Sequence, residues 1–219
     1  MSPAAARNPT SKEDRAVPRS ERTRAAILAA AEALFAERGF AETRLEDVAA
    51  QVGIRRASIF YYFADKTVLY DAVLADVFDG FRSELATVLL GPGSLLDRAS
   101  RAVSTWIGYL ARRPSTARIL LREVADGRPG REAPIIRHTR AYFDLVAQML
   151  EQSAGDPLAA GGPVHSVHLA SLVAGSTVFF FAAMPALLPG LGFDPFESSG
   201  LEAYERELLA TVRRLLTAT

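Results

Sequence analysis

The chain has 219 residues, of which 49% are hydrophobic and 23% charged, so it can form one or two globular domains with a sizeable core. Its formal net charge is zero, which excludes a strong general attraction to nucleic acid, so any such attraction must come from basic residues placed locally. It has no cysteine, which excludes disulfides, thiolate metal sites and a cysteine nucleophile.

Residues 1–19 are polar, and Pro3, Pro9 and Pro18 interrupt them. They offer few apolar groups to bury, so we expect a disordered tail, either plainly solvated or acting as a basic arm that reaches DNA. The tail does not resemble a signal peptide, and the absence of cysteine fits a reducing compartment. We therefore expect a cytoplasmic protein.

The first predicted helix runs from Ser20 to Arg38. Ser20 can cap its start, and Gly39 can end it. Apolar residues recur on one face, which predicts that this helix packs behind the elements that follow. That face carries Ile27, Ala31, Leu34 and Phe35.

Residues 43–66 predict two short helices joined by a tight turn. Thr43 and Glu46 have the spacing of a capping box, and Gly53 can take the left-handed conformation that ends a helix. A second helix fits residues 55–63. This is the helix-turn-helix plan, in which the second helix enters the major groove of DNA.

The side chains of the second helix can be sorted by angle, at 100° per residue. Ile59, Phe60 and Phe63 are expected to point inward, with Arg56 between them but able to reach outward from the first turn. The alternative is that all four aromatic residues of this helix belong to the core. On the opposite side, hydroxyl and guanidinium groups match phosphates and base edges. The outward residues are Arg55, Ala57, Ser58, Tyr61 and Tyr62.

A longer helix is predicted from Ala64 or Asp65 to Leu90. Lys66 lies in its first turn, where the helix dipole disfavours a cation unless a DNA phosphate is also bound there. A plain surface lysine is the alternative. The full set of expected DNA contacts is Arg44, Arg55, Arg56, Ser58, Tyr61, Tyr62 and Lys66.

Residues from Arg22 to about Ala72 resemble the DNA-binding domain of the tetracycline-repressor (TetR) family. Two positions depart from the family pattern: Arg55 stands where Ser or Thr is usual, and Phe60 where Tyr is usual. The resemblance implies a three-helix DNA-binding domain, followed by a helical domain whose last two long helices dimerise. It is carried by Ala31, Leu34-Phe35, Arg38-Gly39-Phe40, Thr43, Val48-Ala49, Val52-Gly53-Ile54, Ser58-Ile59, Tyr62-Phe63, Lys66 and Leu69.

Beyond Gly91-Pro92-Gly93, where we place a domain boundary, helices are predicted over 94–113, 115–126, 135–153 and 199–217. Residues 157–193 contain no Asp, Glu, Lys or Arg. Part of this stretch is long enough to span a membrane, but Pro185 interrupts it and no basic cluster flanks it. We expect a buried helix from Pro163 to Leu188 that pairs with the last helix and with a second subunit in a four-helix interface.

Aromatic residues gather in three segments of this second half. With few polar neighbours, they are typical of a pocket for an apolar or aromatic small molecule, although a filled core has the same composition. The expected lining is Trp106, Tyr109, His138, Tyr142, Phe143, Phe179 and Phe180, with Phe181 beside them.

Motifs for nucleotide binding, metalloprotease or serine hydrolase chemistry are missing from the sequence. His165 and His168 have the spacing of a shared helical face, but two ligands alone hold a metal poorly. Glu123 and Asp126 are paired carboxylates, for which a solvated face is the expectation. We therefore predict no enzyme activity and no cofactor.

Together these features predict an all-α chain. Its expected parts are a tail (1–19), a helix-turn-helix domain (20–66), a linking helix (67–90) and a ligand-binding and dimerisation domain (91–219). The expected function is a homodimeric transcriptional regulator, a repressor released from its DNA operator by a small apolar molecule. The alternative is a helical-bundle enzyme or lipid-binding carrier that does not bind DNA.

Overall fold

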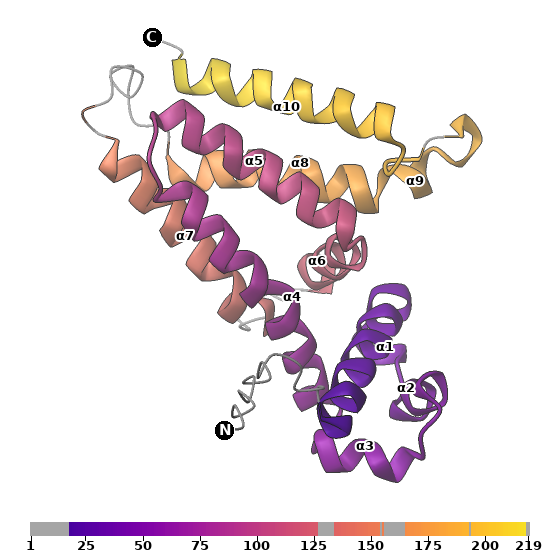
Figure 1. The fold of residues 1–219 in the computed structure, drawn as a ribbon. Coiled ribbons are helices and arrows are strands. Elements are labelled where there is room, and N and C mark those ends of the chain that lie inside the picture. Colours follow the sequence, from indigo (N-terminus) through magenta and orange to yellow (C-terminus); the bar gives the residue numbers. More distant parts are fainter. Residues whose placement is uncertain (1–17, 127–133, 154, 156–164, 193, 218–219) are drawn as a thin grey trace, which may run out of the picture.

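The computed structural model describes residues 18–126, 134–153, 155, 165–192 and 194–217. Every regular element among these residues is a helix, so the all-α prediction is confirmed. No helix of the described residues is long and apolar enough to cross a membrane. In chain order the helices are α1 (Arg19–Glu42), α2 (Leu45–Val52), α3 (Arg56–Tyr62), α4 (Lys66–Leu89), α5 (Leu95–Arg112), α6 (Ser115–Asp126), α7 (Pro134–Gln152), α8 (Ser166–Ala182), α9 (Met184–Leu187), the 3-10 turn Pro189–Leu191 and α10 (Ser198–Thr217) (Figure 1).

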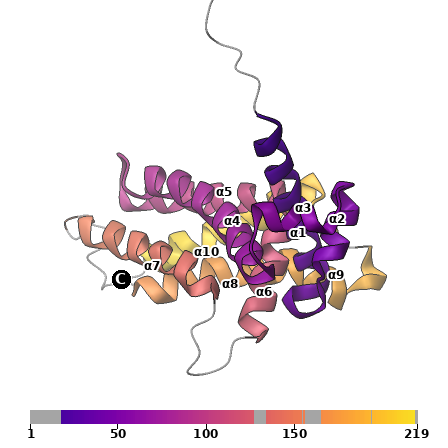
Figure 2. The ribbon, with the colours of Figure 1, turned by 90° about the horizontal axis from the view of Figure 1, so that it is seen from below.

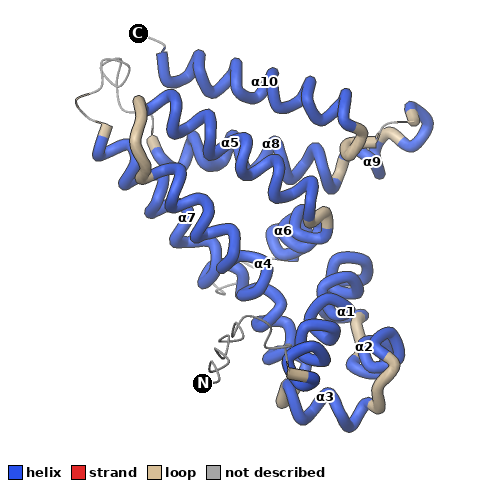
Figure 3. The backbone as a smooth tube through the Cα atoms, in the orientation of Figure 1, coloured by secondary structure: helices blue, strands red, loops and turns tan. Residues whose placement is uncertain are grey.

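The first three helices form a small unit at the lower right of Figure 1, and short loops join them to one another and to α4 (Figure 3). The predicted inner face of α1 is buried, because Ile27, Ala31, Leu34 and Phe35 pack against Val48 of α2 and Ile59 of α3. Gly53 ends α2 at φ 74° and ψ 30°, which confirms the left-handed turn between α2 and α3.

The predicted ends of α1 and α2 need correction. Pro18, not Ser20, precedes the first helical residue, and the helix does not stop before Gly39 but kinks there, at φ 82° and ψ 172°, and resumes to Glu42. Thr43 makes no capping box. It is buried, and its Oγ1 lies 2.7 Å from the Gly39 carbonyl oxygen and 3.2 Å from that of Leu34. The kink brings Thr43 next to the carbonyls at the end of α1, and its hydroxyl stabilises the kink. Arg44 therefore occupies the N-cap position of α2.

Helix α4 belongs to two hydrophobic cores. Its first half, up to Phe78, packs with α1–α3, whereas Phe81, Leu85 and Leu89 pack with α5, α7, α8 and α10. Seen from below in Figure 2, α4 lies between α5 and α7. The cores therefore divide inside α4, and the break at residues 91–93 is the turn to α5, which starts with a capping box between Ser94 and Asp97.

The predicted helix spanning Pro163 to Leu188 is divided. The structure ends α8 at Ala182 and starts the short α9 at Met184, with Pro185 in its first turn. The expectations for the N-terminal tail up to residue 17 and for the loops at 127–133 and 156–163 lie outside the described residues.

Three tyrosines link α4 to its neighbours through buried hydroxyl groups. The Tyr70 hydroxyl donates to Glu123 of α6, Tyr109 of α5 donates to the Val77 carbonyl, and Tyr142 of α7 donates to the Phe78 carbonyl. Desolvation by burial raises the pKa of all three hydroxyls above the usual value for tyrosine. The folded protein therefore holds them neutral.

Stability is expected to fall as the pH rises above about 10, the ordinary pKa of tyrosine. Below that value the contribution of the three hydroxyls is fully present; above it, the unfolded chain loses their protons while the folded chain retains them. Denaturant unfolding at pH 8, 10 and 11 measures the trend, and Tyr142→Phe should make it shallower. A free energy of unfolding that stays constant over this range would contradict the prediction.

Candidate functional site

The outer face of α3 is the first candidate site. Ile59 and Phe63 point into the core, and Arg55 precedes α3 as an exposed N-cap residue whose side chain makes no capping bond. Tyr61 is 82% exposed, as its predicted outward direction requires. Arg44, at the start of α2, is exposed as well.

Two aromatic residues of α3 depart from the sorting by angle. Phe60, expected inside, is 45% exposed, and Tyr62, expected outside, is half-buried against the core and makes an edge contact with Tyr61 at 5.1 Å. Ile59 and Phe63 define the inward direction, and Phe60 and Tyr62 lie on its two flanks, each about 80° away. Phe60 and Tyr62 are therefore each partly exposed and partly buried.

Arg56 and Ser58 are less available than Arg55. Arg56 does reach outward, but its Nε lies 2.9 Å from Glu46, and its guanidinium stacks on the Phe60 ring at 5.6 Å. Ser58 is half-buried. Arg44, Arg55 and Tyr61 therefore form the most open part of the surface, which we call the α3 face.

Lys66 has partners that the sequence did not suggest. Its Nζ donates to the carbonyl oxygens of Phe40 (2.8 Å), Thr43 (3.0 Å) and Ala41 (3.1 Å), and it lies 4.5 Å from the centre of the Phe40 ring. These carbonyls close the end of α1, where a cation is favoured. An ammonium group has three hydrogens, and all three are used. In the described structure Lys66 therefore joins α4 to the end of α1, and its expected phosphate contact stays a prediction.

Replacing Lys66 by methionine is expected to lower the free energy of unfolding by about 2 kcal/mol, because three carbonyls lose a charged donor while the apolar stem remains. Denaturant unfolding measures the loss. Lys66→Arg, which keeps the charge, should recover part of it. If Lys66→Met instead leaves stability unchanged and reduces the salt dependence of DNA binding by about one unit, Lys66 contacts phosphate after all.

The second candidate site is a cavity of about 500 Å³ in the C-terminal half. Its walls come from α4, α5, α6, α7, α8 and α10, and they are almost entirely apolar. The polar atoms of Thr139 and Tyr142 are already bonded to the carbonyls of Ile135 and Phe78. A cavity of this size and character fits a small apolar molecule.

Four of the seven residues expected to line a pocket do so: Trp106, Tyr142, Phe143 and Phe179. The other three lie elsewhere. Tyr109 bonds to the Val77 carbonyl, Phe180 stacks on Tyr204 with ring centres 3.9 Å apart, and Nε2 of His138 lies 3.2 Å from Asp71. Much of the remaining wall is aliphatic, such as Leu89 and Val173, and sequence composition gave no signal for these residues.

Helix α6 forms one wall of this cavity and also touches the N-terminal unit. Leu120, Leu121 and Val124 line the cavity. On its other face, Arg122 donates to the carbonyl of Ala36 through Nε (3.1 Å) and to that of Glu37 through Nη2 (2.6 Å). Glu123 is buried against Tyr70, so the expected solvated face of Glu123 is wrong; its partner is 53 positions away in sequence.

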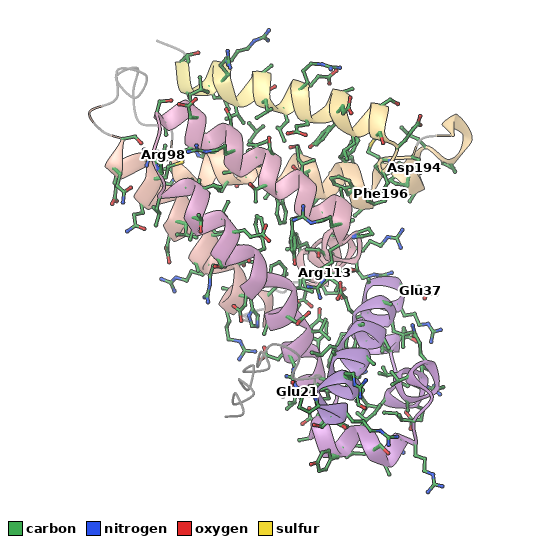
Figure 4. All side chains as sticks on the ribbon, in the orientation of Figure 1. Glu21, Glu37, Arg98, Arg113, Asp194 and Phe196 are labelled. Atoms are coloured by element: carbon green, nitrogen blue, oxygen red, sulfur yellow. The ribbon has the colours of Figure 1, made fainter. Side chains whose placement is uncertain are left out.

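A second link joins the two halves at the end of α5 (Figure 4). Arg113 reaches Glu32 of α1 through Nε at 2.8 Å, and Asp76 of α4 through Nη2 at 2.6 Å. The hydrogen bonds with Glu32 raise the pKa of Arg113, so the guanidinium stays charged. The hydroxyl of Ser115, the first residue of α6, donates to the same Glu32 carboxylate.

The two helices expected to dimerise differ in their outer faces. On α8, His168, Ser171, Gly175 and Phe179 are exposed and uncharged; Gly175 and Phe179, which is 47% exposed, also border the cavity. The outer face of α10 carries charged residues such as Arg206 and Glu207. The rings of His165 and His168 lie 5.3 Å apart, and His165 accepts from the Val167 backbone; no group of three metal-binding side chains occurs in the described part of the chain.

The match to a known protein family lies in the N-terminal unit. Residues 27–73 match the model of the family described as bacterial regulatory proteins, tetR family. The regulator RutR of Escherichia coli K12 is 41% identical over 70 residues, which span about a third of the length of either chain (32%). Both of these matches cover the N-terminal unit and little more.

Solved structures match over most of the chain. FadR of Bacillus subtilis, in complex with stearoyl-CoA, has a TM-score of 0.65 and 14% identity, with 86% of this chain and 96% of that one covered. AibR, in complex with isovaleryl coenzyme A and operator DNA, has a TM-score of 0.68 and 19% identity, with 86% and 97% covered. At these identities the likeness concerns the fold.

Proposed function

We propose, from the premise that this chain is a TetR-family transcriptional regulator, that it binds operator DNA as a homodimer and leaves it when a small apolar molecule fills the C-terminal cavity. DNA binding by the α3 face rests on Arg44, Arg55 and Tyr61, which are exposed residues of the helix-turn-helix segment. A protein that acts on operators would work in the cytoplasm.

The observation that best supports control by a ligand is the position of α6 between the two candidate sites. At 100° per residue, Arg122 points about 150° away from the mean direction of Leu120, Leu121 and Val124, so the cavity face and the α1 face lie on opposite sides of α6. A ligand that displaces Leu121 or Val124 would therefore also move Arg122 against the end of α1. Such a ligand acts only if it favours a conformation that DNA does not.

Helix α4 remains a second route, since it belongs to both cores. A tilt of α4 would change the distance between the two α3 helices of a dimer. Half-sites of an operator lie about 34–36 Å apart or at a multiple of that spacing, so such a tilt would weaken binding.

The neighbours' ligands support an apolar molecule with an acyl chain as the first class to test, because FadR and AibR were solved with stearoyl-CoA and isovaleryl coenzyme A. A gel shift with the DNA upstream of the gene, with and without medium-chain alcohols, esters and acids, tests the proposal. The rival, a helical-bundle enzyme or lipid carrier, would bind such molecules and retard no DNA.

Arg122→Met is expected to leave ligand affinity unchanged and to reduce the effect of the ligand on operator affinity. Allosteric effects of about 5- to 150-fold are typical, and one residue on the connecting path accounts for about 2- to 30-fold. Operator affinity is measured with and without the tightest binder from the panel. Arg118→Met is the control, because Arg118 is an exposed arginine on the same helix. Equal loss in both variants would contradict a specific role for the Arg122 contacts.

A further inference from the structure

The cavity ends beside a buried arginine. Arg98 of α5 is only 7% exposed and lies where the C-terminal end of α4 and the N-terminal end of α5 meet (Figure 4). Its Nη1 donates to the Leu89 carbonyl (3.3 Å) and to Oε1 of Gln152 (3.4 Å), and its Nη2 donates to the hydroxyl of Ser153. Its Nε has no hydrogen-bond partner in the described structure.

These contacts do not offset the free-energy cost of burying the positive charge of Arg98. Among the described residues, every polar contact of Arg98 goes to a neutral acceptor, and the two contacts of Nη1 are long for hydrogen bonds. Burial of a cation is costly unless it is paired with an anion and fully hydrogen-bonded. A planar guanidinium binds a carboxylate through two parallel hydrogen bonds, which are shorter and stronger than those to neutral acceptors.

Arg98 and the cavity share their neighbours. Leu89, whose carbonyl accepts from Arg98, lines the cavity, and so does Met149, whose carbonyl accepts from Ser153 at 2.7 Å. Ala102 also lines it and lies one helical turn beyond Arg98, on the same side of α5. The guanidinium therefore lies directly behind the residues that line this end of the cavity, and none of the described lining residues is charged.

We propose that the ligand is an amphipathic monocarboxylate whose apolar chain fills the cavity and whose carboxylate binds Arg98. The head group takes the place of the long contacts to Leu89 and Gln152, and it pairs with the Nε hydrogen that is now unused. The inference rests on the proposed function, since it names the ligand class of that same cavity.

The test compares decanoate with 1-decanol at neutral pH, through the fluorescence of Trp106. Trp106 is the only tryptophan of the chain and lines the cavity, so its emission reports binding directly. A carboxylate is harder to remove from water than a hydroxyl, so a purely apolar cavity would prefer the alcohol. We expect decanoate to bind the wild-type protein at least about tenfold more tightly than 1-decanol.

Three variants locate the origin of this preference. In Arg98→Met the preference for decanoate should be lost, while 1-decanol binds as before. Arg98→Lys, which keeps the charge, should retain part of the preference. Ser153→Ala, which removes a neutral partner of Arg98 and leaves the cation, should retain it fully. The wild-type comparison and Arg98→Lys carry the test even if the methionine variant fails to fold.

Three results would contradict the proposed role of Arg98, and they can be told apart. Equal affinities, or a preference for the alcohol, in the wild-type protein would overturn the inference and leave the cavity as the ligand site. A preference for decanoate that persists in Arg98→Met would also overturn it, because another group would then recognise the carboxylate. If neither molecule binds while the operator is still retarded in a gel, the ligand part of the proposed function fails together with the inference.

Discussion

Arg55→Ala is expected to lower operator affinity by about ten- to a hundredfold, the largest effect of any single substitution on the α3 face. Arg55 directly precedes α3, and the first residues of a recognition helix meet base edges in the major groove. An arginine that binds two acceptors of guanine contributes about 1–3 kcal/mol of discrimination, which gives the expected factor. Tyr61→Ala with Tyr62→Ala should also weaken binding, chiefly through Tyr61, which is the exposed member of the pair.

Fluorescence anisotropy with operator DNA and with unrelated DNA, at several salt concentrations, measures both the loss and its sequence dependence. The control is Arg82→Ala, which removes the same charge from the exposed surface of α4, outside the N-terminal unit. Arg55→Ala should relax specificity at one base step, whereas Arg82→Ala should change little. Unchanged operator affinity in the double tyrosine variant would show that DNA is read elsewhere.

Gly175→Arg is expected to convert the proposed dimer into monomers, and thereby to remove high-affinity operator binding, which needs two half-sites. Gly175 lies in the exposed uncharged face of α8, and no atom lies within 4 Å of an added Cβ, so the isolated chain tolerates the side chain. In an interface between two such faces, the arginine would be an unpaired buried charge, which is strongly unfavourable.

Light scattering measures the mass, which should fall from twice the chain mass to that of one chain of 23.6 kDa. Gln148→Arg adds the same charge to an exposed position of α7, and it should leave the dimer intact. Circular dichroism and thermal unfolding confirm that both variants fold. A dimer that persists in Gly175→Arg would place the interface away from this face of α8.

The helices were largely predictable, because periodic apolar residues and local chain breakers define them. Gly53 ends α2, Ser94 and Asp97 start α5, and Pro114 separates α5 from α6, all through contacts within a few residues. The same logic predicted the outward direction of Tyr61. Where the residues that determine a helix end or a side-chain direction lie within one helical turn of it, the sequence is enough to predict it.

The differences from the sequence analysis share a different cause, because each involves a partner on another helix. Thr43 has the spacing of a capping residue, but the kink at Gly39 brings its hydroxyl under α1. Lys66 has the position of a phosphate contact, yet the end of α1, more than 20 residues earlier, accepts its hydrogens. No local pattern in the sequence reveals that Glu123 faces Tyr70.

The pocket shows the limit of composition as a guide. Aromatic residues are common in cores and in ligand sites, so Trp106 and Phe143 were indistinguishable in advance from Tyr109 and Phe180. Their separation depends on how α5 and α8 are rotated about their axes, which packing against α4 and α10 decides. Arg98 carried no sequence signal at all, since its significance lies in the neutral acceptors that the described residues place around it.

The division of α6 into two faces has a consequence for the evolution and engineering of this protein. Leu120, Leu121 and Val124 can change, and with them the shape of the cavity, while Arg122 and Glu123 keep their contacts with α1 and α4. Under the proposed control by a ligand, selection for a new ligand can therefore act on one side of a single helix without altering the contacts on the other. Libraries restricted to these three positions should yield biosensors with altered specificity that still control the same promoter.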